Sequence, residues 1–301
     1  MLEFRTDLAM ENLAGDLSYP GVEVHRWQES DIELIEVVIC TDEAARALGK
    51  PRGNYLTLEC PLLREHDPDA RIAMSTLLAE ELGRLLESED TAPVLVVGLG
   101  NRSITPDALG PAVIDKTLVT RHVMNAEFAN NSLRSVCAVA PGVLGVTGVE
   151  TAELVESLVR DIRPRAVICI DSLAARDSRR IGCTIQISNT GIQPGSGVGN
   201  HRKPFSRETL GVDVIAVGIP TVIYAATLAR DAFAMLSDEE KHEQALDALE
   251  KDLLDTSLGN LIVTPRDIDA IVKNCAVLVA AAVNRALQPN LSEAEIAAMM
   301  D

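Results

Sequence analysis

The chain has 301 residues, of which 47% are hydrophobic, so it is long and apolar enough to bury a sizeable core. Its 27 lysines and arginines stand against 45 aspartates and glutamates, and the net charge of -18 opposes direct binding to nucleic acid backbones. The first residues lack the basic and apolar regions of a secretory signal, and no stretch reads as a membrane span. We therefore expect a cytoplasmic protein with no direct nucleic-acid or membrane partner.

The first ninety residues have a mixed pattern. Apolar periodicity predicts strands over 32–40 and 55–58, a short helix beginning at Asp42 and a longer helix over 72–86. No convincing linker follows, so we interpret residues 1–301 as a single domain in which residues 8–90 form an N-terminal appendage.

Strands and helices alternate from Pro93 onward. The predicted strands cover 94–98, 136–140, 166–170, 184–187 and 214–217, and the predicted helices begin near Pro111, near Val149 and at Thr221. Residues 238–301 are predicted to be C-terminal helices. This alternation predicts an α/β fold, namely a three-layer, doubly wound, mostly parallel sheet with helices on both faces.

Two of the apolar runs lead to an aspartate. The run over 94–98 leads through a Gly-x-Gly-Asn turn to Asp107, and the run over 166–170 stops at Asp171. Open α/β sheets place their sites at the carboxyl ends of parallel strands, so the two acids form a candidate catalytic pair. Taken singly, each aspartate could equally cap a helix by accepting a backbone N–H.

Two glycine-rich loops follow later strands. In the loop over 141–151, Gly142, Gly145 and Gly148 allow backbone N–H groups to approach a substrate, although Thr147-x-x-Glu150 also matches a capping box at a helix start. The loop over 188–203 is longer than a connection requires and brings three basic residues beside the predicted acids. These residues are His201, Arg202 and Lys203.

Several segments together resemble a known family. They are TPDALGP at 105–111, PGVLGVTGVET at 141–151, IDSLAAR at 170–176, TIQISNTG at 184–191, PGSGVGN at 194–200 and ETLG at 208–211. In these segments the chain resembles the spore germination protease of endospore-forming bacteria, and 5–9 and 263–265 extend the resemblance to both ends of the chain.

The resemblance implies an endopeptidase that degrades small acid-soluble spore proteins when germination begins. It also implies that the protein is located in the cytoplasm of the developing spore and in the spore core. It implies a homotetramer that is made as a self-processing zymogen, and we expect no cofactor. In this family Asp107 and Asp171 match the two aspartates assigned to catalysis. The family preference for cutting after an acid, before a hydrophobic residue and then Ala, identifies Asp7–Leu8 as the self-processing bond and residues 1–7 as a short propeptide.

The sequence departs from the family pattern in two places. The precursor segment before Leu8 is shorter than the family leads us to expect. Where we expect Pro-Thr-Val-Val-Asp-Ala, the chain has a tyrosine, Tyr224, in place of the aspartate. A phenol is a poorer anion and metal partner than a carboxylate, so we leave Tyr224 out of the catalytic residues.

A pair of carboxylates suits peptide hydrolysis. Two acids that share one proton supply a base for the attacking water and an acid for the leaving amine, because repulsion between their charges separates the two pKa values of the pair. We expect Asp107 and Asp171 to hold this water, and backbone N–H groups between Gly142 and Gly148 to stabilise the oxyanion. Arg202 or Lys203 would recognise the acidic residue before the cut.

Two other interpretations stay open at this point. The arrangement is also similar to hydrogenase-maturation endopeptidases, in which carboxylates and a histidine bind a metal, and Asp107, Asp171 and His201 would supply such a set here. Alternatively, the chain is a non-catalytic binding module whose glycine-rich loops hold a ligand or partner while the aspartates cap helices.

Overall fold

A computed structural model describes residues 6–13, 19–87, 92–123, 133–195, 203–236 and 261–300, together with positions 252, 253, 256 and 259. The strands are β1 (Val22–Glu29), β2 (Ile32–Ile39), β3 (Gly53–Glu59), β4 (Val94–Gly98), β5 (Val136–Val139), β6 (Ala166–Ala175), β7 (Thr184–Ser188), β8 (Asp213–Tyr224) and β9 (Ile262–Val263). The helices are α1 (Asp42–Leu48), α2 (Pro68–Leu85), α3 (Leu109–Ile114), α4 (Leu144–Thr147), α5 (Thr151–Ile162), α6 (Arg207–Leu210), α7 (Ala225–Leu236), α9 (Ile268–Leu287) and α10 (Glu293–Met300). The expected α/β class is confirmed.

The described strands form one mixed sheet in the order β1-β2-β3-β7-β8-β6-β4-β5, with β9 paired to β8. Only the neighbours from β8 to β5 run parallel, and the remaining pairs are antiparallel. The expectation of a mostly parallel sheet was therefore wrong. The reason is visible at the β1–β2 hairpin, where two residues join the strands, because so short a connection permits only antiparallel pairing.

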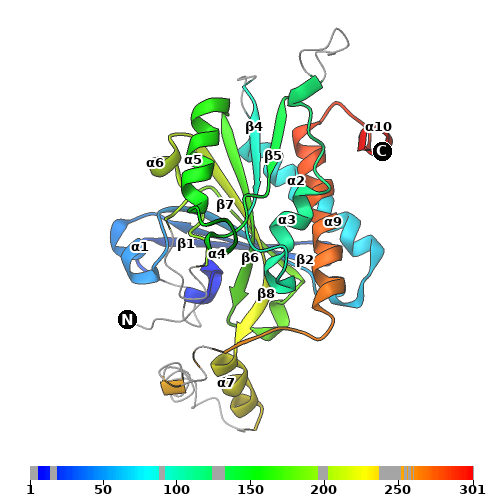
Figure 1. Ribbon diagram of the computed structural model, residues 1–301. Helices are drawn as coiled ribbons and strands as arrows, with labels where there is room; N and C mark the ends of the chain where they lie inside the picture. Colours follow the sequence, from blue (N-terminus) through cyan, green and yellow to red (C-terminus); the bar gives the residue numbers. More distant parts are fainter. Residues whose placement is uncertain are drawn as a thin grey trace.

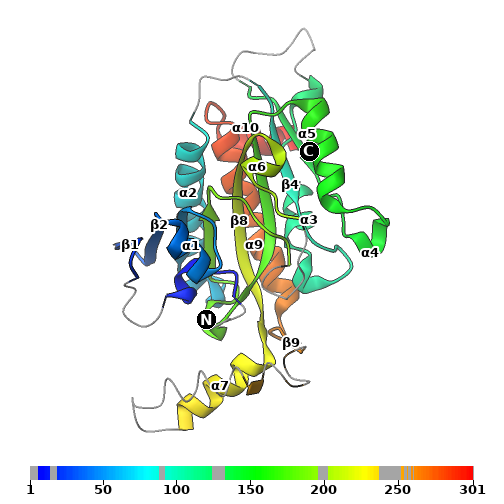
Figure 2. The ribbon, with the colours of Figure 1, turned by 90° about the vertical axis from the view of Figure 1, so that its left-hand side faces the viewer.

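Helices cover both faces of the parallel part of the sheet, as expected (Figures 1 and 2). Alternate residues of each strand point to opposite faces, so Val96 and Ile168 pack in the cluster that contains α2, α3 and α9. Val97 and Val167 point the other way and pack against α5. This burial on both faces explains why β4 and β6 are continuous apolar runs.

One helix of the described chain, α9, is long and apolar enough to cross a membrane by length and composition. In the structure, 61% of its most apolar window is buried. The helix packs beside α2 in the largest hydrophobic cluster, which accounts for its composition.

Several predicted elements match the structure closely, including the strand at 94–98 and the helix beginning at Asp42. The helix predicted from Thr221 was wrong, because β8 continues to Tyr224 and α7 begins at Ala225. Long β8 pairs with β6 along most of its length and with β9 at its end, and these partners extend the strand. Helix α7 lies beyond that end, away from the rest of the sheet (Figure 2).

The N-terminal strands belong to the same sheet as the rest of the chain. Strand β3 pairs with β7 from Tyr55 to Glu59, so β1, β2 and β3 continue the sheet. The prediction that residues 8–90 form an appendage to a single domain stays a prediction. The predicted C-terminal helical region from Asp238 lies outside the described residues as far as 251, and α9 and α10 confirm its later part.

Candidate active site

Asp107 lies in a compact turn directly after β4. The turn is closed by the amide of Asn101, which donates to Oδ2 of Asp107 at 2.8 Å, and by the amide of Asp107, which donates to the carbonyl of Ile104 at 2.8 Å. The N-cap position of α3 is Ala108, so Asp107 does not cap this helix. The helix-cap interpretation of Asp107 was therefore wrong.

Glycines allow this turn to lie against the sheet. Gly100 has φ +108°, and a Cβ atom at this position would lie 2.1 Å from the carbonyl oxygen of Asp107. A Cβ on Gly110 would lie 2.3 Å from the carbonyl oxygen of Leu99. Neither position has room for a side chain, so the sequence of this turn fixes where the Asp107 carboxylate sits.

Asp171 lies inside β6 and not at its end. The strand continues to Ala175, whereas its neighbour β4 stops at Gly98, which pairs with Ile170. Asp171 therefore lies one residue beyond the end of β4, on a strand that continues alone on that side. The residue is 5% exposed, and its Oδ1 accepts the amide of Ser172 at 2.9 Å. Because no helix begins there, the capping interpretation of Asp171 was also wrong.

The structure brings the two aspartates to one cavity of about 370 Å³. It lies where the loops after β4 and β5 meet the middle of β6 and the end of β8. Its polar lining includes Asp7, Asp107, Thr151, Asp171, Thr221 and Thr264. A cavity of this size, lined by both aspartates, has room for a short stretch of peptide and a water molecule.

Two threonines of this cavity position the Asp107 turn, and sequence reasoning missed both. Thr221 of β8 is 1% exposed, and its hydroxyl donates to the carbonyl of Pro106 at 2.7 Å. Thr264 donates in turn to the carbonyl of Thr221 at 2.8 Å. The one sequence feature that could have indicated Thr221 was the strand character of residues 214–224. We did not use it, because we assigned a helix from Thr221.

Tyr224 is 2% exposed and pairs with Ile262 of β9. It does not belong to the lining of the cavity that contains the two aspartates. In this chain the tyrosine is therefore a buried strand residue at the end of β8.

The first glycine-rich loop meets the cavity at its beginning and, through Thr151, at its end. Gly142 and Val143 line the cavity, whereas Gly145 and Gly148 do not. The amides of residues 146–148 donate within the loop, and Gly148 with φ +72° ends α4. The predicted capping box at Thr147 was wrong, because α5 has Glu150 at its N-cap position and no side-chain cap.

The structure describes one of the three basic residues of the second loop. His201 and Arg202 lie outside the described residues. The ammonium group of Lys203 is paired with Glu156 on α5, and Lys203 does not line the cavity of the two aspartates. Within the described part of the chain, no three His, Cys, Asp or Glu side chains form a group that could hold a metal.

The Asp7–Leu8 bond is anchored next to β6. The amide of Asp7 donates to the carbonyl of Ala174 at 2.9 Å, and Oδ2 of Asp7 accepts the amide of Ala174 at 2.9 Å. Leu8 is fully buried and packs against Leu173 and Tyr55 in one hydrophobic cluster. Asp7 lines the same cavity as Asp107 and Asp171, so the structure places all three aspartates around one space.

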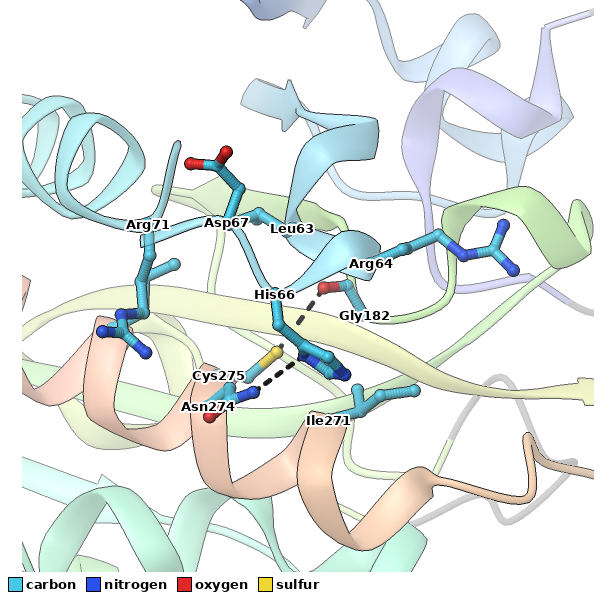
Figure 3. A pocket seen from close by; sticks show the side chains of 10 residues that line it. Leu63, Arg64, His66, Asp67, Arg71, Gly182, Ile271, Asn274 and Cys275 are labelled. Atoms are coloured by element: carbon cyan, nitrogen blue, oxygen red, sulfur yellow. Dashed lines mark hydrogen bonds between the residues drawn. The ribbon is translucent and has the colours of Figure 1, made fainter. Parts of the chain in front are cut away.

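Another small cavity, of about 20 Å³, lies between the start of α2 and the middle of α9 (Figure 3). Asn274 and Nδ1 of His66 are hydrogen-bonded at 3.0 Å, and Sγ of Cys275 donates to the carbonyl of Gly182 at 3.6 Å. A space of this size holds about one water molecule. We therefore interpret this cavity as a packing feature.

Comparison with known proteins shows which family the chain resembles. The model of the germination protease family, peptidase family A25, matches residues 6–243. A germination protease of Clostridium perfringens strain 13 is 41% identical, covering 97% of each chain. The germination protease of Caldanaerobacter subterraneus subsp. tengcongensis is 42% identical over 98% of each chain, and that of Priestia megaterium is 36% identical over 95% of this chain and 92% of its own.

Proposed function

Because the chain belongs to the germination protease family and is therefore a peptidase, we propose that it degrades small acid-soluble spore proteins within the germinating spore. Asp107 and Asp171 are the proposed catalytic residues. The observation that carries this assignment is their common position on one cavity, together with the chain's own Asp7.

In the proposed mechanism the two carboxylates hold the attacking water between them. Repulsion between like charges opposes ionisation of both, so one carboxylate takes a proton from water while the other carboxyl group gives a proton to the leaving amine. The buried position of Asp171 strengthens this repulsion, because water screens it poorly there. The protein holds both groups rigidly, Asp107 by its turn and Asp171 by β6, which favours a well-defined water position.

We further propose that the chain processes itself at Asp7–Leu8, which gives cleavage after an acidic residue. Asp7 already reaches the cavity of Asp107 and Asp171, and the buried Leu8 side chain fills an apolar site next to it. Amides at the start of the loop, at Gly142 and Val143, are candidate donors to the oxyanion because this part of the loop lines the cavity. Assembly into a homotetramer remains part of this proposal and rests on the family alone.

The test uses mass spectrometry of the purified full chain during mild acid incubation, with a peptide cleavage assay alongside. We expect the unaltered chain to lose residues 1–7, and Asp107→Asn or Asp171→Asn to slow both reactions by about 10²- to 10⁴-fold while thermal unfolding stays within a few degrees. Asp213→Asn, which makes the same change at an exposed aspartate of β8 outside the cavity lining, is the control. Full activity in either Asn variant would refute the assignment.

The same assay addresses the metal-dependent alternative that uses Asp107, Asp171 and His201. A His201→Ala variant and a chelated sample are measured beside the unaltered chain. Loss of cleavage in both, with recovery on addition of Zn²⁺ to the unaltered chain only, would replace the aspartic mechanism by the metal mechanism. If the folded, unaltered chain cleaves no spore-protein substrate under any of these conditions, the result favours the binding-module interpretation.

A further inference from the structure

Asp7 lies where two cavities meet. Besides the cavity of Asp107 and Asp171, a larger one of about 600 Å³ lies between α1, β7 and the loop before α6. The two cavities share Asp7 and Leu173. Leu173 is apolar, so Asp7 is the charged residue common to both linings.

The backbone carbonyl of Asp7, which belongs to the Asp7–Leu8 bond, accepts two hydrogen bonds from distant parts of the chain. Nζ of Lys50 donates to it at 2.9 Å, and Nε2 of Gln186 donates at 3.1 Å. On the other side of Leu8, the amide of Ala9 donates to Oε1 of Gln186 at 2.7 Å. The Gln186 amide therefore spans the bond, and Lys50 adds a cation to its carbonyl.

The side chain of Asp7 is held as well. The amide of Ala174 donates to Oδ2, so a carboxylate at this place receives a fixed backbone donor. Burial lowers the pKa of Lys50, and the negative charges of Asp7 and Glu11 oppose this effect. The half-buried Lys50 side chain thus lies near two carboxylates of the N-terminal segment.

We propose that Lys50, Gln186 and the amide of Ala174 form the subsite that binds the acidic residue before the cut, and that Asp7 occupies it in the precursor. This inference rests on the proposed function. When residues 1–7 leave, the three donors lose their acceptors and Lys50 loses one of its two carboxylates. The backbone carbonyl of any residue in the place of Asp7 restores the contacts of Lys50 and Gln186. Only an acidic residue also restores the acceptor for the Ala174 amide and the second negative charge near Lys50.

Two other cations of the same cavity are poorer candidates. Arg52 is paired with Asp42 at 3.3 Å, and Arg207 with Asp213 at 2.8 Å, and in both pairs each side chain is more than half exposed. Their charges are hydrated and compensated already. Lys50 is the specificity-determining residue in this proposal. It takes the role in recognising the acidic residue that was predicted from the sequence for Arg202 or Lys203.

The test compares two peptides that differ only in Asp or Asn before the cut. Each protein is first shown by mass spectrometry to have lost residues 1–7, and kcat/KM is then measured for both peptides. We expect Lys50→Met to reduce the preference for Asp over Asn by about tenfold or more, because kcat/KM should fall for the Asp peptide and change little for the Asn peptide. Lys50→Arg should keep most of the preference, and Arg52→Met, which removes a cation from the same cavity, should leave it unchanged.

An unchanged preference in processed Lys50→Met would overturn the subsite, while cleavage itself would still uphold the proposed function. Absence of cleavage by the unaltered chain would instead overturn the proposed function. If Lys50→Met does not fold, Lys50→Gln, which keeps an amide donor, takes its place with the same expected loss.

A Lys50→Met chain that folds but retains residues 1–7 is tested on its own bond in a double-mutant cycle with Asp7→Asn. The subsite predicts that Lys50→Met slows cleavage after residue 7 by about tenfold more in the chain with Asp7 than in the chain that carries Asp7→Asn. Equal slowing in both chains would refute recognition of the acid by Lys50.

Discussion

The parallel and antiparallel parts of the sheet position their residues of the candidate site in different ways. On the parallel side, Asp107 and Asp171 are placed mainly by backbone features, a tight glycine turn and a strand that extends beyond its neighbour, and the Thr221 hydroxyl adds one side-chain contact to the turn. On the antiparallel side, the N-terminal segment is held by side chains from distant elements, among them Lys50, Gln186 and Arg180.

This difference suggests a division of roles. A backbone turn holds a carboxylate in one position, which suits a catalytic group. Side-chain contacts to a segment can be released when that segment is cut, which suits a part of the site that would change during the proposed processing. Substitutions on the two sides should therefore have different consequences, and three of them test the comparison.

The largest effect on stability is expected at Arg180. Its guanidinium group donates to Glu11 at 2.6 Å and to Glu59 at 3.2 Å, and the Glu11 side chain is 2% exposed. Arg180→Met would leave a buried carboxylate without its cation and lower the free energy of unfolding by about 3 kcal/mol. Urea unfolding of the unprocessed chain measures this loss.

The adjacent Arg179 provides the matched control for that measurement. It is paired with Asp177, but its side chain is 83% exposed. Arg179→Met should change the free energy of unfolding by less than about 0.5 kcal/mol. Equal losses in the two variants would contradict the view that buried ionic contacts anchor the N-terminal segment.

A smaller loss of stability is expected in the turn on the parallel side. Gly100→Ala places a Cβ against the backbone of Asp107 at a positive φ, and should cost about 2 kcal/mol. Because the turn carries Asp107, we expect peptide cleavage by the folded fraction to fall by more than about tenfold. Gly148→Ala also has a positive φ but meets nothing within 4 Å, so it should cost about 1 kcal/mol and leave cleavage nearly unchanged. Equal activity of the two variants would show that the turn does not position Asp107.

The smallest effect is a pH dependence on the antiparallel side. Burial raises the pKa of Tyr55 from 10.0 to about 12. The folded state therefore keeps the phenol neutral while the unfolded state ionises, and this stabilisation is complete below pH 10 and declines as the pH rises toward 12. Between pH 8 and pH 11 the unaltered chain should lose about 1.4 kcal/mol that Tyr55→Phe does not lose. Tyr19→Phe serves as the control and should follow the unaltered chain, and a Tyr55→Phe chain with the same decline would refute the assignment.

Local patterns were sufficient for much of the parallel half. The apolar run at 94–98 predicted β4 correctly, and the two aspartates stood out because each follows such a run. The same patterns failed at Thr221, because a strand held by β6 and β9 there has a composition that also suits a helix. Strand β1 was not predicted, since most of its residues are exposed on the hairpin and its apolar signal is weak.

By itself, the sequence determined the α/β class and the family and brought out Asp107 and Asp171 as candidates, because apolar periodicity and short motifs are local properties of a chain. The tertiary structure decided that Asp7, Lys50, Ala174 and Gln186 meet at one bond. These residues are up to 179 positions apart, and their contacts depend on the strand order that places β3 beside β7 and the N-terminal segment beside β6. Strand order follows from how all the apolar faces are buried together, which no single segment specifies.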